Sequence, residues 1–196
     1  MKSIFKLILK KCFIVIMLPM YLLFITLSFG RSSNSTFQGF SQLLSLIPGK
    51  LGIYTRAAFY HLACPDTSDN ISIGFMTIFS HRDTSIAEGV YIGPQGNIGK
   101  CSIGKNTLLG SGVHILSGKN QHDFSDLSKP IQQQGGKFTK IYIGEDCWIG
   151  NGAIVMANIA NQCIIAAGGV LTKDTVSEPT IYAGNPAKMI KNRVSE

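Results

Sequence analysis

The feature that most constrains this chain is an aliphatic residue that recurs every six positions. From residue 143 the sequence reads IGEDCWIGNGAIV, and two further stretches, IIAAGGVLTKD and IYAGNPAKMIK, follow. A six-residue period is typical of one flat face of a parallel β-helix with three short strands per coil. Such a coil is filled by its own side chains, so any chemistry must lie between subunits or in a loop that interrupts the period. The recurring residues here are Ile143, Ile149, Val155, Ile159, Ile165 and Leu171.

The same period runs through the middle of the chain, starting at Ile71. Six Ile-Gly or Leu-Gly pairs in near-constant phase argue against chance clustering. We therefore predict a mainly β protein, a parallel β-helix over residues 71–196. The earlier members of the period are Ile86, Ile92 and Ile98, followed one residue out of step by Ile103, Leu109 and Ile115.

The period disappears between Leu116 and Ile141. The intervening segment is polar and longer than the roughly 12–15 residues usual for an unstructured connection. We predict that residues 117–140 form a loop extruded from one corner of the coil, from which it can reach a neighbouring subunit. His122 lies near its start, and the nearby Asp123 and Asp126 are residues typical of loop turns.

The N-terminal segment is strongly apolar. Eighteen residues without a charge, Cys12–Phe29, follow four lysines. This is long enough for a membrane helix, and three interpretations stay open: a cleaved signal peptide with Ser28-Phe29-Gly30 as its site, a single span, or an embedded helix broken near Pro19 that does not cross. The third is favoured because two short amphipathic helices follow, which could lie in a membrane interface. The predicted segments are 1–30 (membrane-embedded), 31–70 (amphipathic linker) and 71–196 (β-helix).

Charge and cysteine content exclude several classes of function. The net charge of +7 comes largely from lysines and an arginine at the two ends, and two basic ends are not a nucleic-acid groove. The five cysteines are odd in number and include no CxxC pair. Neither a disulfide framework nor a thiolate metal site is indicated, and a reducing compartment is expected.

The motifs IGEDCWIGNGAIV, AAGGVLTKD and YAGNPAK, in this order and at these distances, resemble the hexapeptide-repeat acyltransferases. That group includes maltose, galactoside and serine O-acetyltransferases and the xenobiotic acetyltransferases, and the resemblance covers Ile71 to about Val194. The apolar basic N-terminus with FQGFSQLLSLIPG looks like a membrane-associated branch that modifies surface polysaccharide or glycolipid. The resemblance implies a left-handed β-helix, a homotrimer with sites between subunits, and acetyl-CoA as co-substrate without a metal. We also expect a short C-terminal helix that carries Lys188 and Lys191.

The resemblance also implies roles for individual residues. The loop histidine, His122, would be the general base, since imidazole with a pKa near ~6.5 can accept a hydroxyl proton at neutral pH. No nucleophilic cysteine is needed. The coil after Val155 is two residues short, and Asn161-Gln162 replaces the usual turn, so coenzyme contacts there are transferred with less support. The implied coenzyme contacts are Trp148, Asn151, Ala167, Gly168, Thr172, Lys173 and Lys188.

Two other functions remain open from the sequence. His81, His114 and His122 could supply the three ligands of a zinc carbonic anhydrase built across a subunit interface. A membrane-tethered scaffold without catalytic activity is the second. The favoured function is O-acetyl transfer from acetyl-CoA to a sugar hydroxyl, on a membrane-proximal or lipid-linked glycan, at the cytoplasmic face of the inner membrane. The sequence does not identify the acceptor.

Overall fold

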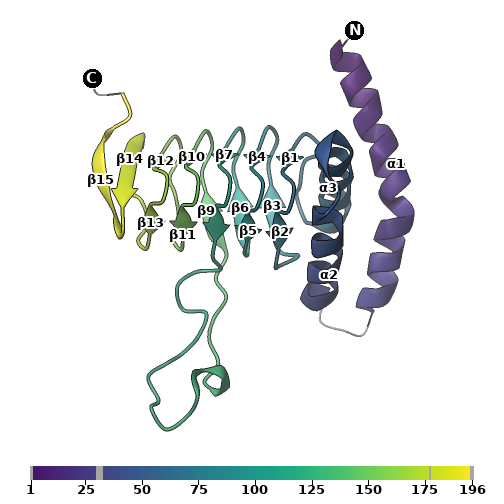
Figure 1. Ribbon diagram of the computed structural model, residues 1–196. Coiled ribbons are helices and arrows are strands. Elements are labelled where there is room, and N and C mark those ends of the chain that lie inside the picture. The colour runs from purple at the N-terminus through teal and green to yellow at the C-terminus, as the bar shows by residue number, and fades with distance from the viewer. Residues whose placement is uncertain (1, 30–32, 177, 195–196) are drawn as a thin grey trace.

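The computed structural model describes residues 2–29, 33–176 and 178–194. Figure 1 shows a stack of short coils with a layer of helices at its N-terminal end and a hairpin at its C-terminal end. The predicted segment boundaries at residues 1, 30, 31 and 196 lie outside the described residues, and so does the Gly30 of the possible cleavage site.

The coils are built from three sheets whose strands run parallel, apart from the last pair. The first sheet contains β1 (Ser72–Ile73), β4 (Tyr91–Ile92), β7 (Leu108–Leu109), β10 (Trp148–Ile149), β12 (Ile164–Ile165), β14 (Thr180–Gly184) and β15 (Ala187–Asn192). The second contains β2 (Ile78–Phe79), β5 (Asn97–Ile98), β8 (His114–Ile115), β11 (Ile154–Val155) and β13 (Val170–Leu171). The third contains β3 (Ser85–Ile86), β6 (Cys101–Ile103) and β9 (Ile141–Ile143).

The aliphatic residues of the six-residue period fill the inside of the coil. The second residue of nearly every two-residue strand is buried, and the parallel register stacks these residues on one another, as with Ile73 on Ile92 and Ile149 on Ile165. Full burial of one such side chain stabilises a fold by about 1.5–3 kcal/mol. The predicted mainly β fold with parallel strands is confirmed.

Three helices cover the N-terminal end of the coil: α1 (Lys2–Ser28), α2 (Ser33–Ser45) and α3 (Gly49–Ala63). The α2 helix packs on β2, α3 packs on β1, and α1 lies along α3 and α2. The sequence left a membrane interface open for the apolar faces of α2 and α3. The structure buries the aromatic part of those faces inside the protein, while Leu43 stays 56% exposed. The buried aromatic cluster consists of Phe24, Phe37, Phe40, Phe59 and Tyr60.

A buried arginine ties this helical layer to the first coil. Arg56 is fully buried; its Nε donates to the Ile73 carbonyl at 2.9 Å, and its Nη1 donates to the Ile47 carbonyl at 2.8 Å. Burial lowers the pKa of this guanidinium. Because its charge is solvated only by carbonyl groups, Arg56 holds α2, α3 and β1 in one arrangement.

The prediction that the apolar helix breaks near Pro19 is wrong. The α1 helix continues through Pro19 to Ser28. Proline removes one backbone hydrogen bond, but Met17 and Phe24 are buried against the protein on either side of it. These contacts keep the helix continuous where the backbone hydrogen bond of residue 19 is missing.

The prediction of a short C-terminal helix carrying Lys188 and Lys191 is also wrong. Residues Ala187–Asn192 form β15, which runs antiparallel to β14. The strand β14 would otherwise present an unpaired edge at the end of the first sheet. Pairing of β15 with β14 satisfies the backbone groups along that edge. A helix of this length would be marginal by itself and would leave the edge of β14 exposed to water.

Candidate active site

The interruption of the period forms a long loop between β8 and β9. Figure 1 shows it extending from the middle of the stack, across the direction in which the coils stack (downward in this view). Its stem is closed by backbone hydrogen bonds from Thr139 to the Ser117 carbonyl (2.9 Å) and from Lys137 to the Asn120 carbonyl (2.7 Å). At its tip Asp126 accepts hydrogen bonds from Ser128, so this carboxylate organises a loop turn.

His122 lies at the outer end of the stem, with its side chain exposed. The returning chain passes very close to its backbone: a Cβ on Gly136 would lie 2.0 Å from the Gln121 carbonyl oxygen and 2.8 Å from the His122 Cα. Gly136 also has φ of 148°, which side chains rarely adopt. Gly136 therefore has a positional role, because only glycine lets the two halves of the loop meet behind His122.

A cavity of about 540 Å³ lies beside the base of this stem, between the loop, the second sheet and α2. Its side chains are mostly amides and hydroxyls, with one aromatic ring. The helix α2 contributes Asn34 and Gln38, four residues apart on one face, and sequence reasoning missed both. The lining residues used below are Asn34, Gln38, His81, Asn97, Gln121 and Phe138.

His81 is the titratable side chain of this cavity. Its Nδ1 lies 2.9 Å from the Ser80 hydroxyl, and its ring lies 5.1 Å from the Phe138 ring, centre to centre. Burial and the nearby Lys100 lower the pKa of His81, with Asp83 acting in the opposite direction. The pKa of Asp83 is itself lowered, first by the hydrogen bond from Lys140. His81 therefore favours the neutral form at pH 7.

The third histidine, His114, lies elsewhere on the second sheet. It is exposed on β8, in register with Asn97 and Ile154 of the neighbouring coils. Among the residues that the structure describes, no group of three His, Cys, Asp or Glu side chains is placed to hold a metal ion.

Trp148 projects from the outer face of the first sheet. It is 54% exposed and stands in register with Leu108, which in turn pairs with Tyr91. These three large side chains form an exposed stripe across neighbouring coils. An outer wall of this composition is suited to contact with another chain.

The corner between the first and second sheets carries the next group of predicted contacts. The Oδ1 of Asn151 accepts a hydrogen bond from the Ser111 amide at 3.0 Å, and its carbonyl accepts one from Gly168 at 2.8 Å. A Cβ on Gly150 would lie 2.4 Å from the Ala167 nitrogen. Small residues at this corner therefore let successive coils stack closely and leave the backbone accessible.

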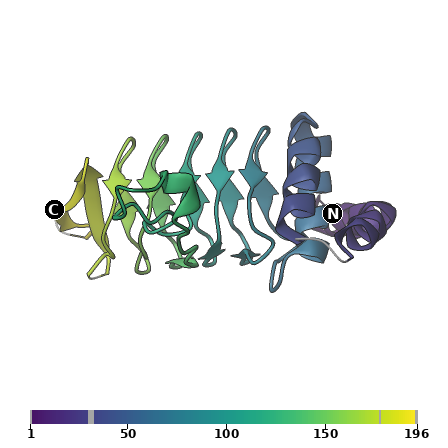
Figure 2. The ribbon, with the colours of Figure 1, turned by 90° about the horizontal axis from the view of Figure 1, so that it is seen from below.

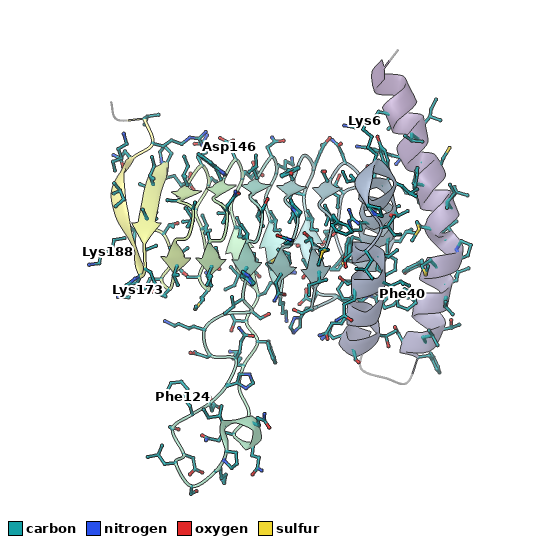
Figure 3. All side chains as sticks on the ribbon, viewed as in Figure 1. Lys6, Phe40, Phe124, Asp146, Lys173 and Lys188 are labelled. Carbon is teal, nitrogen blue, oxygen red and sulfur yellow. The ribbon has the colours of Figure 1, made fainter. Side chains whose placement is uncertain are left out.

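Thr172 and Lys173 lie on the edge from which the loop departs. They follow β13, just as the loop follows β8, and both strands belong to the second sheet. Lys188 pairs with Ala183 in the terminal hairpin. Figure 3 shows Lys173 and Lys188 at the end of the stack that is far from the helices.

One chain therefore divides the predicted residues between two corners. His122, Thr172 and Lys173 belong to the corner after the second sheet, whereas Asn151, Ala167 and Gly168 belong to the corner before it. The second sheet separates the two groups within a chain.

Curated relatives agree on the class of protein. No protein-family model matches the chain. A chloramphenicol acetyltransferase of Klebsiella aerogenes is 31% identical over 65% of this chain and 70% of its own length. A probable macrolide acetyltransferase of Lysinibacillus sphaericus is 33% identical over 54% of this chain, and the match spans 64% of that relative. A putative lipopolysaccharide biosynthesis O-acetyltransferase of Escherichia coli is 28% identical over 61% of this chain and 63% of its own length.

Solved structures agree on the fold. A maltose O-acetyltransferase from Clostridium difficile superposes with a TM-score of 0.69 at 20% identity, over 81% of this chain and 87% of that chain. The polysialic acid O-acetyltransferase OatWY superposes with a TM-score of 0.52 at 26% identity, over 64% and 62%. The coil is thus that of the left-handed β-helix acetyltransferases, and these relatives do not favour the carbonic anhydrase or scaffold alternatives. This chain belongs to the hexapeptide-repeat acyltransferases.

Proposed function

We propose that this protein transfers an acetyl group from acetyl-CoA to a sugar hydroxyl of a surface polysaccharide or glycolipid. It would act as a membrane-associated homotrimer on the cytoplasmic side of the inner membrane, where acetyl-CoA is available. Relatives named for lipopolysaccharide biosynthesis and for polysialic acid support a glycan acceptor. The observation that carries the proposal is the polar cavity next to the stem that holds His122.

The cavity has the chemistry of a carbohydrate site. Sugar hydroxyls both donate and accept hydrogen bonds, and so do amide and hydroxyl side chains such as those of Gln38, Asn97 and Gln121. Phe138 offers a ring to the apolar face of a sugar. The volume of about 540 Å³ is within the usual range of ligand sites. Because His81 favours the neutral form, the cavity suits an uncharged part of the acceptor.

Acetyl transfer at this site needs one base and no covalent enzyme intermediate. His122 would accept the proton of the sugar hydroxyl as its oxygen attacks the thioester carbonyl. A carbon–oxygen bond forms, and the tetrahedral intermediate carries a negative oxygen. The backbone N–H of Asn151 would stabilise that oxygen, since those of Gly150 and Gly152 already donate to the carbonyls of Ile165 and Ser111. The carbon–sulfur bond then breaks, and the departing coenzyme A thiolate takes the proton from His122.

Exposed apolar side chains support the trimer. Phe124 and Leu127 near the loop tip are 72% and 97% exposed, and Trp148 belongs to the exposed stripe on the first sheet. If the loop of one chain lies over that stripe on the next, both surfaces are covered. The same contact joins His122 of one chain to the Asn151 corner of its neighbour. The two groups that one chain keeps apart would then form a single site.

The coenzyme would lie along the half of the coils that is far from the helices. Trp148 would line the cleft, Asn151 would approach the acetyl group, and the small residues of the next corner would meet the pantetheine arm. Lys173 and Lys188, at the far end of the stack, would bind the coenzyme's phosphates. The full set of coenzyme contacts proposed here is Trp148, Asn151, Ala167, Gly168, Thr172, Lys173 and Lys188.

The deciding experiment measures acetyl transfer, and acetyl-CoA hydrolysis, by the wild type and His122→Ala. We expect turnover to fall by about 10²–10⁴-fold, the scale of general-base catalysis. His61→Ala is the matched control, since His61 lies on α3 and does not line the cavity, and it should change the rate by less than about threefold. An unchanged rate in His122→Ala would rule out His122 as the base.

Two further measurements test the alternatives. Calorimetry with acetyl-CoA should show binding in both the wild type and His122→Ala, because the base does not hold the coenzyme. Absence of binding would favour the scaffold. Stoichiometric zinc with chelator-sensitive CO₂ hydration would favour the carbonic anhydrase.

A further inference from the structure

The helix α1 presents two different apolar faces. One face packs against α2, α3 and the first coil, through residues spaced three or four apart: Phe13, Met17, Met20 and Phe24. The segment Lys6–Ser28 is long and apolar enough to cross a membrane by length and composition. A helix that is apolar on all sides needs a cover on every side. The uncovered residues of the outer face include Leu7, Ile8, Val15, Ile16, Leu18, Leu22, Leu23, Ile25 and Leu27, each between 37% and 64% exposed.

Both ends of α1 are attached to the same globular surface. At the N-terminal end, Lys10 donates to the Asn70 side chain, and the Lys11 ammonium lies 2.5 Å from the Asp69 carboxylate. Toward the other end, Phe24 packs on Phe37 and Phe59, and the Arg82 guanidinium lies 5.4 Å from its ring centre. The helix rises about 21 Å between residues 10 and 24. It is therefore attached along most of its length.

This attachment is incompatible with a helix that crosses the bilayer in the arrangement of this structure. A crossing α1 would carry α2, α3 and the first coil into the hydrocarbon. Charged groups such as Asp69 and Arg82 are costly there, and open sheet edges do not occur there. A helix that lies in the membrane plane avoids both penalties, because only its outer face enters the lipid.

The placement of α1 in the molecule agrees with an in-plane helix. It is the outermost element at the N-terminal end and runs across the direction in which the coils stack (Figure 1). Figure 2, turned by 90°, shows α1 nearly end-on and again outside α2 and α3. The outer face of α1 therefore points away from the coils. A bilayer on that face would place the coil axis along the membrane normal.

A basic cavity lies where the N-terminal part of α1 meets α3 and the first coil. Lys6 and Lys10 from α1 and Lys50 from α3 line a space of about 510 Å³, together with Tyr54 and Tyr91. Figure 3 shows Lys6 at this end of α1.

Acidic groups beside this cavity do not cancel its charge. Asp69 and Glu88 lie next to it, where they line an adjoining space with Lys6 and Lys10. Asp69 is paired with Lys11. The segment 2–28 contains no acidic residue. The cavity thus retains an excess of positive charge and is suited to a phosphate group.

We propose that α1 lies flat in the membrane interface, and that Lys6, Lys10 and Lys50 bind the phosphate of an anionic lipid headgroup. The proposal rests on the membrane association proposed above and does not depend on acetyl transfer. It commits to lipid as the cover of the outer face. A second copy of the chain or another protein is an outcome of the test.

The orientation of α1 can be measured by spin-label depth. Among the described cysteines Cys12 is the exposed one and the other four are buried, so Cys12→Ser removes the accessible thiol. Ile8→Cys, Val15→Cys and Leu22→Cys, made one at a time in that background, place labels seven residues apart on the outer face, where each native side chain is 56–64% exposed.

An in-plane helix gives three similar depths in phosphatidylglycerol vesicles. A crossing helix gives depths that differ by about 10 Å from one label to the next, and this result would overturn the proposal. If all three labels are in water, the outer face of α1 does not enter lipid. That result would overturn the proposal and favour another protein chain as its cover. None of these readouts uses enzymatic activity, so loss of acetyl transfer would leave the result intact.

The headgroup site has its own test in vesicle flotation of the full chain. We expect binding to phosphatidylglycerol vesicles to exceed binding to phosphatidylcholine vesicles, and Lys6→Gln and Lys50→Gln each to weaken the former by about fivefold. The matched control is Lys105→Gln, an exposed lysine at a coil corner, which should have no effect.

Soluble glycerol phosphate distinguishes a lipid headgroup from a free phosphate. Competition by it at millimolar concentration in the wild type, with equal loss in both vesicle types, would show a general anion site and contradict the lipid assignment. Equal effects of Lys6→Gln, Lys50→Gln and Lys105→Gln would mean that net charge alone causes the preference for phosphatidylglycerol. That result would contradict a specific headgroup site.

Discussion

The coil and the loop that leaves it differ in how their side chains are placed: the aliphatic side chains of the coil's period point inward and are buried, and most side chains of the loop are exposed. In the coil, each inward residue is buried and stacks on its equivalent in the next coil, as Ile149 does on Ile165. In the loop, residues 117–140 are held by a few backbone hydrogen bonds at the stem, and most side chains are exposed. The coil supplies stability with no room for chemistry, whereas the loop supplies an exposed imidazole with little stability. Changes in the two regions should therefore have separable effects.

The largest expected effect comes from opening the coil. Ile149→Ala removes a fully buried side chain from the stacked interior and should lower the free energy of unfolding by about 2–5 kcal/mol. Urea denaturation measures it. Ser125→Ala, at an exposed position near the loop tip, should change that free energy by less than about 0.5 kcal/mol. Similar losses in both variants would show that the loop carries stability after all.

A substitution in the loop should impair turnover and spare the fold. Gly136→Ala puts a methyl group against the backbone of Gln121 and His122, and must displace the proposed base. We expect kcat to fall by about 10–100-fold, since a displacement of about 1 Å can cost 10²-fold. The melting temperature should change little. Gly39→Ala, with no atom near the added carbon, is the control, and an unaltered kcat in Gly136→Ala would show that loop closure does not position His122.

The far end of the coil should affect the coenzyme alone. Lys173→Glu and Lys188→Glu each replace an attraction for phosphate by a repulsion, and should raise the KM for acetyl-CoA by about tenfold with kcat nearly unchanged. Steady-state kinetics at low salt measures this best, because salt screens such contacts. Lys105→Glu serves as the charge-matched control. If the KM for the acceptor rose and the KM for acetyl-CoA did not, the acceptor and not the coenzyme would lie at this end of the coils.

The smallest expected effect concerns His81, where loop and coil meet. Burial holds the folded-state pKa of His81 below its unfolded value near ~6.5. The stability that depends on neutral His81 is therefore present above about pH 6.5 and is lost as the pH falls through the lowered folded pKa. Thermal melts of the wild type between pH 7.5 and 5 should show a decline that is shallower in His81→Gln. Parallel curves would mean that His81 does not titrate in this range.

The sequence predicted the coil well because each coil contacts only its neighbours, so a short period carries the whole pattern. It could not predict the cavity, since Gln38 of α2 reaches it only through long-range packing, with its amide donating to the Ser80 carbonyl at 3.0 Å. The course of the chain at Pro19 and at the C-terminus was missed for the same reason. Contacts on either side of Pro19 and the open edge of β14 decided those elements, and both depend on distant partners. The roles of His122 and the coenzyme contacts are still predictions.

If α1 lies in the membrane plane as proposed, the number of coils sets the distance of each residue from the membrane. Neighbouring parallel strands are about 4.8 Å apart, so each coil adds that much height above the membrane. The loop leaves the third strand of the second sheet, and Lys173 follows the fifth. These points stand about 10 Å and 20 Å above the first coil. Adding or removing one coil beneath the loop would shift by about 5 Å the height at which a glycan is modified.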